Sequence, residues 1–92
     1  MKRVKNKFKK NKSILMVIWQ DAAFSYRKKF PQESIPMQIT FGIFLDKTKE
    51  AIKIGMNCHL DPNNKEIIEG KDVFLIPKGV IKEIKNIGDF NG

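Results

Sequence analysis

Two neighbouring stretches, residues 37–46 and 51–59, alternate hydrophobic with polar or small residues at the period of two that a β-strand imposes. The polar segment 46–50 between them predicts a hairpin loop. Gly42 is expected to mark a bend or bulge in the first strand. Phe44 falls on the polar face of that strand, where its ring is expected to be exposed. An exposed phenylalanine at this position indicates either a second small core under a loop or an interface. The opposite face of this pair is predicted to be buried, with Ile39, Phe41, Ile43, Leu45, Ile52, Ile54, Met56 and Cys58.

Three further segments have strand character. Residues 14–19 (ILMVIW) are hydrophobic without interruption, which is typical of a central strand covered on both faces. Residues 73–76 form the next hydrophobic run, and Pro77 and Gly79 then predict a break in pairing and a sharp turn. In residues 80–87 isoleucine recurs every three positions, which also fits a helix. We favour a strand for 80–85 because the segment is β-branched and follows a corner.

Together these segments predict an all-β fold, a small five-stranded SH3-like or Sm-like antiparallel barrel with a short turn or 3-10 corner before the last strand. The chain of 92 residues has room for one hydrophobic core. We divide it into a basic disordered tail (1–12), the barrel domain (13–88) and a C-terminal end (89–92). The predicted core comprises Leu15, Val17, Trp19, Ile39, Phe41, Ile43, Ile52, Ile54, Val73, Leu75, Ile81 and Ile84.

Charge is concentrated at the N-terminus. The formal net charge is +8, and residues 1–12 carry +7 of it with no acidic residue, so the remainder is nearly neutral. A polycation of this kind attracts phosphate-rich partners or acidic protein surfaces. A solvated tail with a solubilising role explains the same composition. The predicted tail contacts are Lys2, Arg3, Lys5, Lys7, Lys9, Lys10 and Lys12.

The long connection between the first two strands, residues 20–36, interleaves aromatic and basic side chains. Aromatic rings stack on nucleobases, and guanidinium and ammonium groups neutralise phosphates. Alternatively, Phe24 and Phe30 anchor the loop to the core, and Asp21 caps a local turn beside a buried Trp19. Lys78, on the corner before the last strand, extends the same basic surface. The predicted ligand-binding residues are Tyr26, Arg27, Lys28, Lys29 and Lys78.

Three short patterns resemble a group of small phage and prophage proteins that are largely uncharacterised. They are W-x-D-A at Trp19–Ala22, T-x-G at Thr40–Gly42, and I-P-x-x-x-I-x-x-I at Ile76–Ile84. The resemblance covers roughly residues 14–87 and excludes the lysine-rich tail. It implies a small SH3-like or Sm-like barrel of mobile-element origin, and no activity.

Catalytic chemistry is not evident in the sequence. It has no Gly-rich phosphate loop, no G-x-S-x-G and no H-E-x-x-H. His59 is the only histidine, and Cys58, the only cysteine, is expected on the opposite strand face, where it acts as a small buried hydrophobe. We therefore expect a non-enzyme with no cofactor and no metal site. One cysteine excludes an internal disulfide, no apolar run spans a bilayer, and no secretory signal follows the basic start, so we expect a cytoplasmic protein, in the host cell if phage-encoded.

Three functional hypotheses remain open. The first is a binding protein that holds nucleic acid or a signalling nucleotide with the basic-aromatic loop and the tail. The second is a protein-binding module that inhibits a host enzyme or defence complex. The third is a homo-oligomer formed through strand edges and Phe44. No membrane partner is expected.

Overall fold

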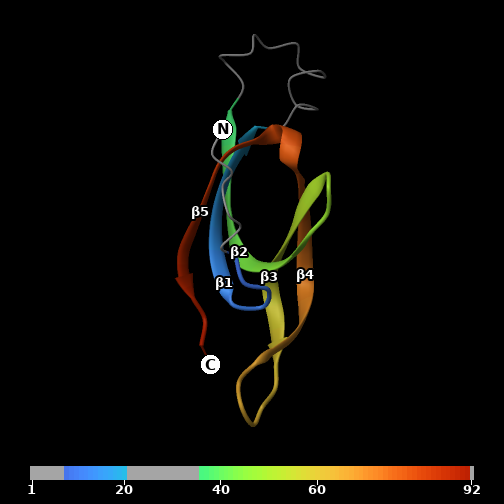
Figure 1. The fold of residues 1–92 in the computed structure, drawn as a ribbon, viewed down its shortest axis with the longest axis vertical. Helices are drawn as coiled ribbons and strands as arrows, with labels where there is room; N and C mark the ends of the chain where they lie inside the picture. The colour runs from blue at the N-terminus through green and yellow to red at the C-terminus, as the bar shows by residue number, and fades with distance from the viewer. Residues whose placement is uncertain (1–7, 21–35, 92) are drawn as a thin grey trace.

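Five antiparallel strands form a single strongly curved sheet in the order β4-β3-β2-β1-β5 (Figure 1). The computed structural model describes residues 8–20 and 36–91. A 3-10 turn, η2 (Lys78–Val80), joins the two edge strands. This architecture confirms the predicted all-β fold, the corner, and the choice of a strand for the last segment. The strands are β1 (Ser13–Gln20), β2 (Met37–Lys47), β3 (Ala51–Leu60), β4 (Ile67–Pro77) and β5 (Ile81–Asp89).

Strand β1 is central, as its uninterrupted hydrophobic sequence predicts. It pairs with β2 on one side and with β5 on the other. Leu15 and Val17 point to the inside of the curved sheet and are fully buried. The alternate residues, including Met16 and Ile18, are half-buried on the outer face. The inner face of β1 therefore carries the core, and the outer face, predicted to be covered as well, is only half-buried.

Strand β2 bends at Gly42, which allows one strand to serve both halves of the sheet. Its first half, up to Ile43, pairs with β1, and its second half, from Ile43 opposite Gly55 onward, pairs with β3. A Cβ atom on Gly42 would overlap the Ile54 side chain and lie 2.8 Å from the carbonyl oxygen of Gly55. A side chain is excluded because the sheet folds back on itself at this point.

The core lies on the opposite face of β2 from the one that alternation predicts. Phe44 is 1% exposed, whereas Ile39 and Phe41 are 54% and 52% exposed. On β4, Ile76 is buried, while Val73 and Leu75 are 40% and 57% exposed. The predicted core was therefore wrong at Ile39, Phe41, Val73 and Leu75, and the exposure predicted for Phe44 was wrong. The buried hydrophobic residues are Leu15, Val17, Phe44, Ile52, Ile54 and Ile76, packed against Phe8, Trp19, Phe74, Val80, Ile81 and Ile84.

The inner face of β2 combines a polar, a small and a large residue, and each matches the side chain that it contacts. Thr40 is buried beside Trp19, whose indole Nε1–H donates a 3.0 Å hydrogen bond to the threonine hydroxyl. Gly42 leaves room for the Ile54 side chain, and Phe44 is part of the hydrophobic core. A polar residue and a glycine on the buried face made that face look solvent-exposed in the sequence.

Strand β3 departs from strict alternation where its pairing with β4 shifts register on both sides of Asn57. Ile52 and Ile54 are buried as predicted, but Met56 is 51% exposed. A register shift of one residue moves the following side chains to the other face of a sheet. The predicted inward position of Met56 was therefore wrong.

The end of the basic tail packs against the domain. The ring of Phe8 meets that of Phe44 edge-on with centroids 5.7 Å apart, and the backbone N–H of Asn11 donates to the carbonyl of Phe44 at 2.8 Å. These contacts fix residues 8–12 over one end of the core. The described residues contain no helix with the length and apolar character needed to cross a membrane.

Candidate functional site

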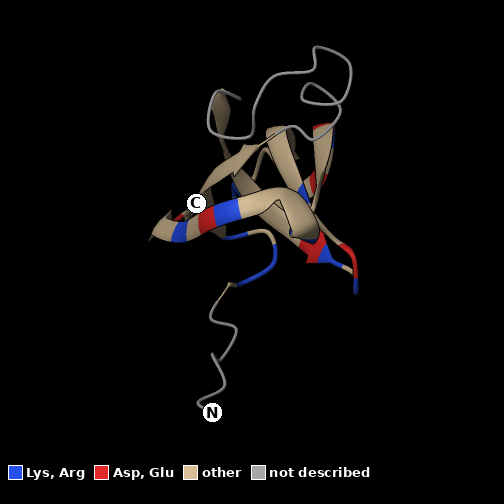
Figure 2. Ribbon diagram, turned by 90° about the horizontal axis from the view of Figure 1, so that it is seen from above, with Lys and Arg blue, Asp and Glu red and all other residues tan. Residues whose placement is uncertain are grey.

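A tight basic turn, residues 9–13, leads into β1. The backbone N–H groups of Lys12 and Ser13 both donate to the carbonyl of Lys9, at 3.1 and 3.0 Å. Asn11 has a positive φ of 63°, a conformation that asparagine tolerates better than most residues. Lys10, Asn11 and Lys12 are all exposed. Figure 2 shows the basic positions along the described segment that leads into β1.

The Ser13 hydroxyl anchors this turn to the end of β5. It accepts hydrogen bonds from the Lys9 backbone N–H at 2.8 Å and from the Asn86 side chain at 3.2 Å, and donates to Asp89 at 3.2 Å. The amide of Asn86, with the Ser13 hydroxyl and the Lys9 ammonium, holds the pKa of Asp89 below its ordinary value. Beyond the strand, the N–H of Phe90 donates to the carbonyl of Lys12 at 2.8 Å. The two ends of the described chain are therefore locked together.

The β3–β4 loop, residues 61–66, is the third component. Asp61 accepts hydrogen bonds from the backbone N–H groups of Asn63 and Asn64, and the Asn64 side-chain oxygen accepts one from the N–H of Glu66. The carbonyl of Glu66 closes the loop by accepting from the N–H of Asp61 at 2.8 Å. The oxygen of the Asn64 side chain is thus engaged within the loop, and its NH₂ group is a hydrogen-bond donor.

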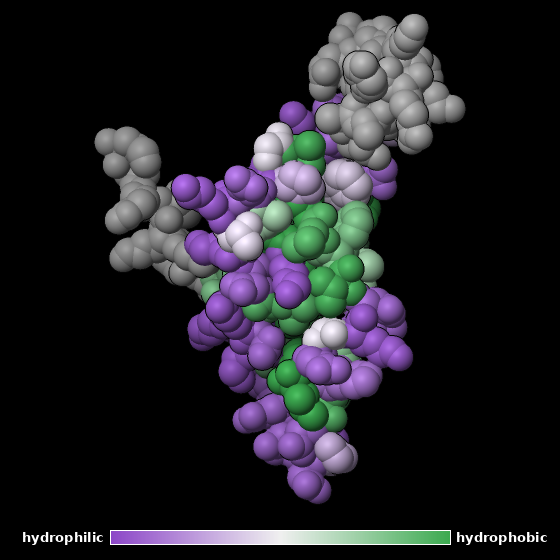
Figure 3. Space-filling model, turned by 90° about the vertical axis from the view of Figure 1, so that its right-hand side faces the viewer, coloured by the Kyte–Doolittle hydropathy of each residue, from purple (hydrophilic) through white to green (hydrophobic). Residues whose placement is uncertain are grey.

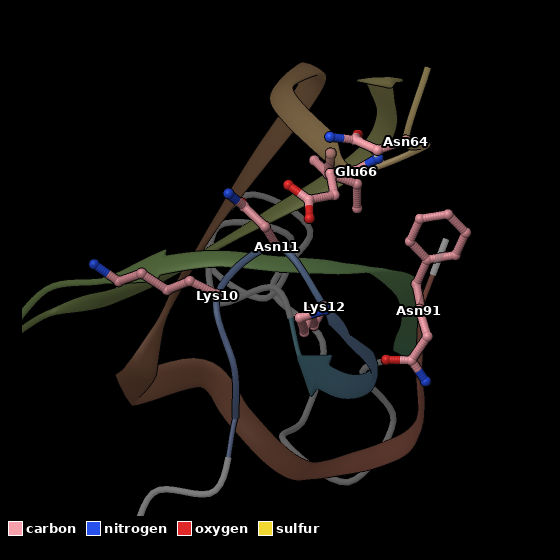
Figure 4. Close-up of a pocket in the computed structure, with 8 residues that line it drawn as sticks. Lys10, Asn11, Lys12, Asn64, Glu66 and Asn91 are labelled. Carbon is pink, nitrogen blue, oxygen red and sulfur yellow. The ribbon is translucent and has the colours of Figure 1, made fainter. Parts of the chain in front are cut away.

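These three segments surround a polar hollow of about 240 Å³ (Figure 4). Asn64 and Glu66 stand on one side, Asn11 and Lys12 on the turn, and Asn91 beside the C-terminal end. The lining includes three side-chain amides, one carboxylate and two lysines, of which Lys10 extends away from the hollow toward its ion-pair partner Asp46 (Figure 4). The lining residues are Lys10, Asn11, Lys12, Asn64, Glu66, Ile67, Phe90 and Asn91.

An apolar hollow of about 210 Å³ adjoins the polar one, and the two share Ile67 and Phe90. Together they form what we call the groove. The change from polar to apolar lining occurs at the shared pair. The apolar hollow is lined by Ile43, Gly55, Met56, Asn57, Cys58, Leu60, Ile67 and Phe90.

The lysines of the turn differ in their electrostatic surroundings. Lys9 lies 3.7 Å from Asp89, and Lys10 lies 3.1 Å from Asp46. The backbone N–H of Lys47 and the ammonium of Lys10 hold the pKa of Asp46 below its ordinary value. Lys12, which lines the polar hollow, forms no ion pair with any carboxylate in the described part of the chain. Its charge is therefore the least compensated of the three.

The predicted site residues divide into three groups. Lys9, Lys10 and Lys12 share one turn beside the groove. Lys78 lies on η2, at the opposite end of the sheet from the C-terminus and the β3–β4 loop (Figure 1), so the structure does not bring it to this surface. The remaining predicted contacts lie outside the described residues, as does Asp21: Lys2, Arg3, Lys5, Lys7, Tyr26, Arg27, Lys28 and Lys29.

Sequence reasoning missed the non-basic part of the groove. Asn64 and Glu66 lie in a segment predicted to be turn-rich, Asn91 lies in the predicted polar C-terminal end, and Asn11 lies in the predicted basic tail. One signal was present, since Phe90 is an isolated aromatic residue in an otherwise polar end. In the folded protein this residue is half-buried and lines the groove together with residues of β3 and the β3–β4 loop.

The structure places His59 and Cys58, the two residues considered for catalysis in the sequence. His59 faces Glu69 across β3 and β4 with 3.7 Å between ring nitrogen and carboxylate, and both are exposed. Burial raises the pKa of the Cys58 thiol, which disfavours the reactive thiolate. Within residues 8–20 and 36–91, no three His, Cys, Asp or Glu residues cluster closely enough to hold a metal ion.

Comparison with known proteins adds no relative. No family model matches the chain, and neither the curated proteins nor the solved structures contain a match.

Proposed function

We propose that this chain is a non-enzymatic protein that binds a nucleic acid or nucleotide through the groove, with phosphate held at the basic turn. The observation that carries the proposal is the position of Lys12, an ammonium group without a carboxylate partner among the described residues, at the edge of a hollow lined with amide donors. Lysine and amide groups are common phosphate contacts. The four cations of residues 1–7 directly precede this turn in the sequence and add long-range attraction.

The lining favours a nucleotide-type ligand over a simple anion. Glu66 contributes a carboxylate, which repels a bare phosphate but accepts hydrogen bonds from a base amino group or a ribose hydroxyl. The amides of Asn11, Asn64 and Asn91 can donate and accept. The mixture matches a ligand that carries both negative charge and donor groups.

Fluorescence anisotropy with labelled single-stranded oligonucleotides across a salt series tests this function. We expect affinity to fall steeply with salt, and Lys12→Gln to reduce the slope of log K against log salt by about 0.7. Lys78→Gln is the matched control because it removes the same charge at the opposite end of the sheet, and its slope should equal that of the wild type. A nucleotide that stabilises the protein in thermal melts, when oligonucleotides do not bind, would identify a nucleotide ligand. Absence of both effects at low salt would refute the proposal.

A protein-binding role is the second candidate, and exposed hydrophobic residues favour it. Met37, Ile39 and Phe41 are each more than half exposed on the outer face of β2. Figure 3 shows that hydrophobic residues also gather on the side of the molecule that β4 forms. A host protein bound stoichiometrically after nuclease treatment, and lost with Phe41→Asp but retained with Lys12→Gln, would favour this role. Light scattering of the wild type and Phe41→Asp would reveal self-association through the same face.

A further inference from the structure

We infer that the apolar hollow seats one unpaired nucleobase against the Phe90 ring, so that the protein prefers single strands to duplexes. The inference rests on the proposed function and adds what that function leaves open, namely how the ligand's uncharged part is recognised. Its evidence is a second hollow that the phosphate contacts do not use.

The apolar hollow has the chemistry of a base-binding pocket. Phe90 supplies an aromatic surface, and Met56 and Leu60 of β3 line the same hollow with half-exposed apolar side chains. Stacking of a base on an aromatic side chain contributes about 1–3 kcal/mol and tolerates different bases. A methionine thioether also makes favourable contacts with rings.

The position of Phe90 connects the apolar hollow to the polar hollow. Its backbone N–H is bonded to the carbonyl of Lys12, and Phe90 itself lines both hollows. A base seated on the ring therefore has its own phosphate within the part of the groove that Lys12 borders. One nucleotide can therefore place its phosphate in the polar hollow and its base in the apolar hollow, which share Ile67 and Phe90.

Charge complementarity favours this occupant over an acidic peptide. The turn is basic, which suits either ligand, but the Glu66 carboxylate next to Ile67 disfavours a second acidic side chain. Exocyclic amino groups of adenine, cytosine or guanine are suitable donors to that carboxylate. In a duplex the base faces are stacked and the edges paired, so the pocket accepts only an unpaired nucleotide.

Four ligands of equal length separate base recognition from phosphate binding: a single strand, its duplex, an abasic strand and an acidic peptide. We expect the wild type to bind the single strand at least about fivefold more tightly than the abasic strand, as one stacked base implies. Phe90→Leu should abolish this difference without changing abasic binding, and Phe90→Tyr should retain it. Lys12→Gln should weaken both strands equally.

Met56→Gln is the variant that guards against misfolding, since Met56 is exposed and its substitution leaves the core intact. It should reduce single-strand affinity roughly twofold to tenfold with an unchanged melting temperature. Equal wild-type affinity for intact and abasic strands would overturn the base pocket and leave the proposed function standing. Preferential binding of the acidic peptide would overturn both.

Discussion

The two faces of strand β2 each carry a phenylalanine, and the two rings have opposite surroundings. Phe44 is enclosed by Leu15, Ile54 and Ile76, whereas Phe41, three positions earlier, is half exposed on the outside. The alternation of side chains thus identified the strand correctly but predicted the wrong one of its two faces to be buried. The buried face contains Thr40 and Gly42 as well as Phe44, and it is buried because of the neighbours that contact it, Trp19 and Ile54.

The largest expected effect tests this difference directly. Phe44→Ala should lower the free energy of unfolding by about 3–5 kcal/mol because it leaves a cavity in the core. The matched substitution Phe41→Ala should cost less than about 1 kcal/mol, since it removes a surface side chain. Urea denaturation followed by Trp19 fluorescence measures both. Equal losses would show that the two faces contribute alike, and the comparison would fail.

Gly42→Ala should have the next largest effect. Its new methyl group overlaps Ile54, and overpacking of this kind costs about 1–3 kcal/mol. The control is Gly79→Ala, because a Cβ at Gly79 has no atom within 4 Å, and its stability should stay within about 0.5 kcal/mol of the wild type. If Gly42→Ala were as neutral as its control, the bend would not need a glycine.

A smaller effect concerns the polar residue on the inner face. A double-mutant cycle with Trp19→Phe and Thr40→Val should give a coupling energy of about 0.5–1.5 kcal/mol for the indole–hydroxyl bond. Because Trp19→Phe removes the only tryptophan of the chain, urea denaturation followed by circular dichroism provides the four free energies. A coupling of zero would mean that Thr40 is buried without being needed by Trp19.

The smallest effect appears in acid, at the edge of the inner face where Ser13 binds Asp89. Hydrogen bonds hold the pKa of Asp89 below its ordinary value in the folded protein, so the carboxylate adds stability above the unfolded pKa of about 4. That stability is lost as the pH falls through the lower, folded pKa. In acid titrations monitored by circular dichroism, Asp89→Asn should therefore flatten the decline below about pH 4. An unchanged acid profile would contradict this contribution.

Sequence reasoning predicted the elements well because their signals are local. The positions of the first three strands, the hairpin and the corner before the last strand follow from alternation and turn chemistry. The last two strands are longer than predicted, since β4 begins at Ile67 instead of residue 73 and β5 continues to Asp89 instead of residue 85. Facing and register depended on contacts between strands, such as Ile54 over Gly42 and the shifts around Asn57, which no single segment encodes. The tail lysines at 9, 10 and 12 were found by composition. The hollow beside them was not, because its walls are distant in the chain.

The bond between Ser13 and Asp89, which are 76 positions apart, also bears on the order in which the protein folds. Closing so long a loop is entropically costly and slow compared with forming the β2–β3 hairpin. The groove therefore exists only after the last and most distant strand has docked. A partly folded chain would have its hairpin but nowhere to hold a ligand, so ligand binding would report the fraction of molecules that has completed folding.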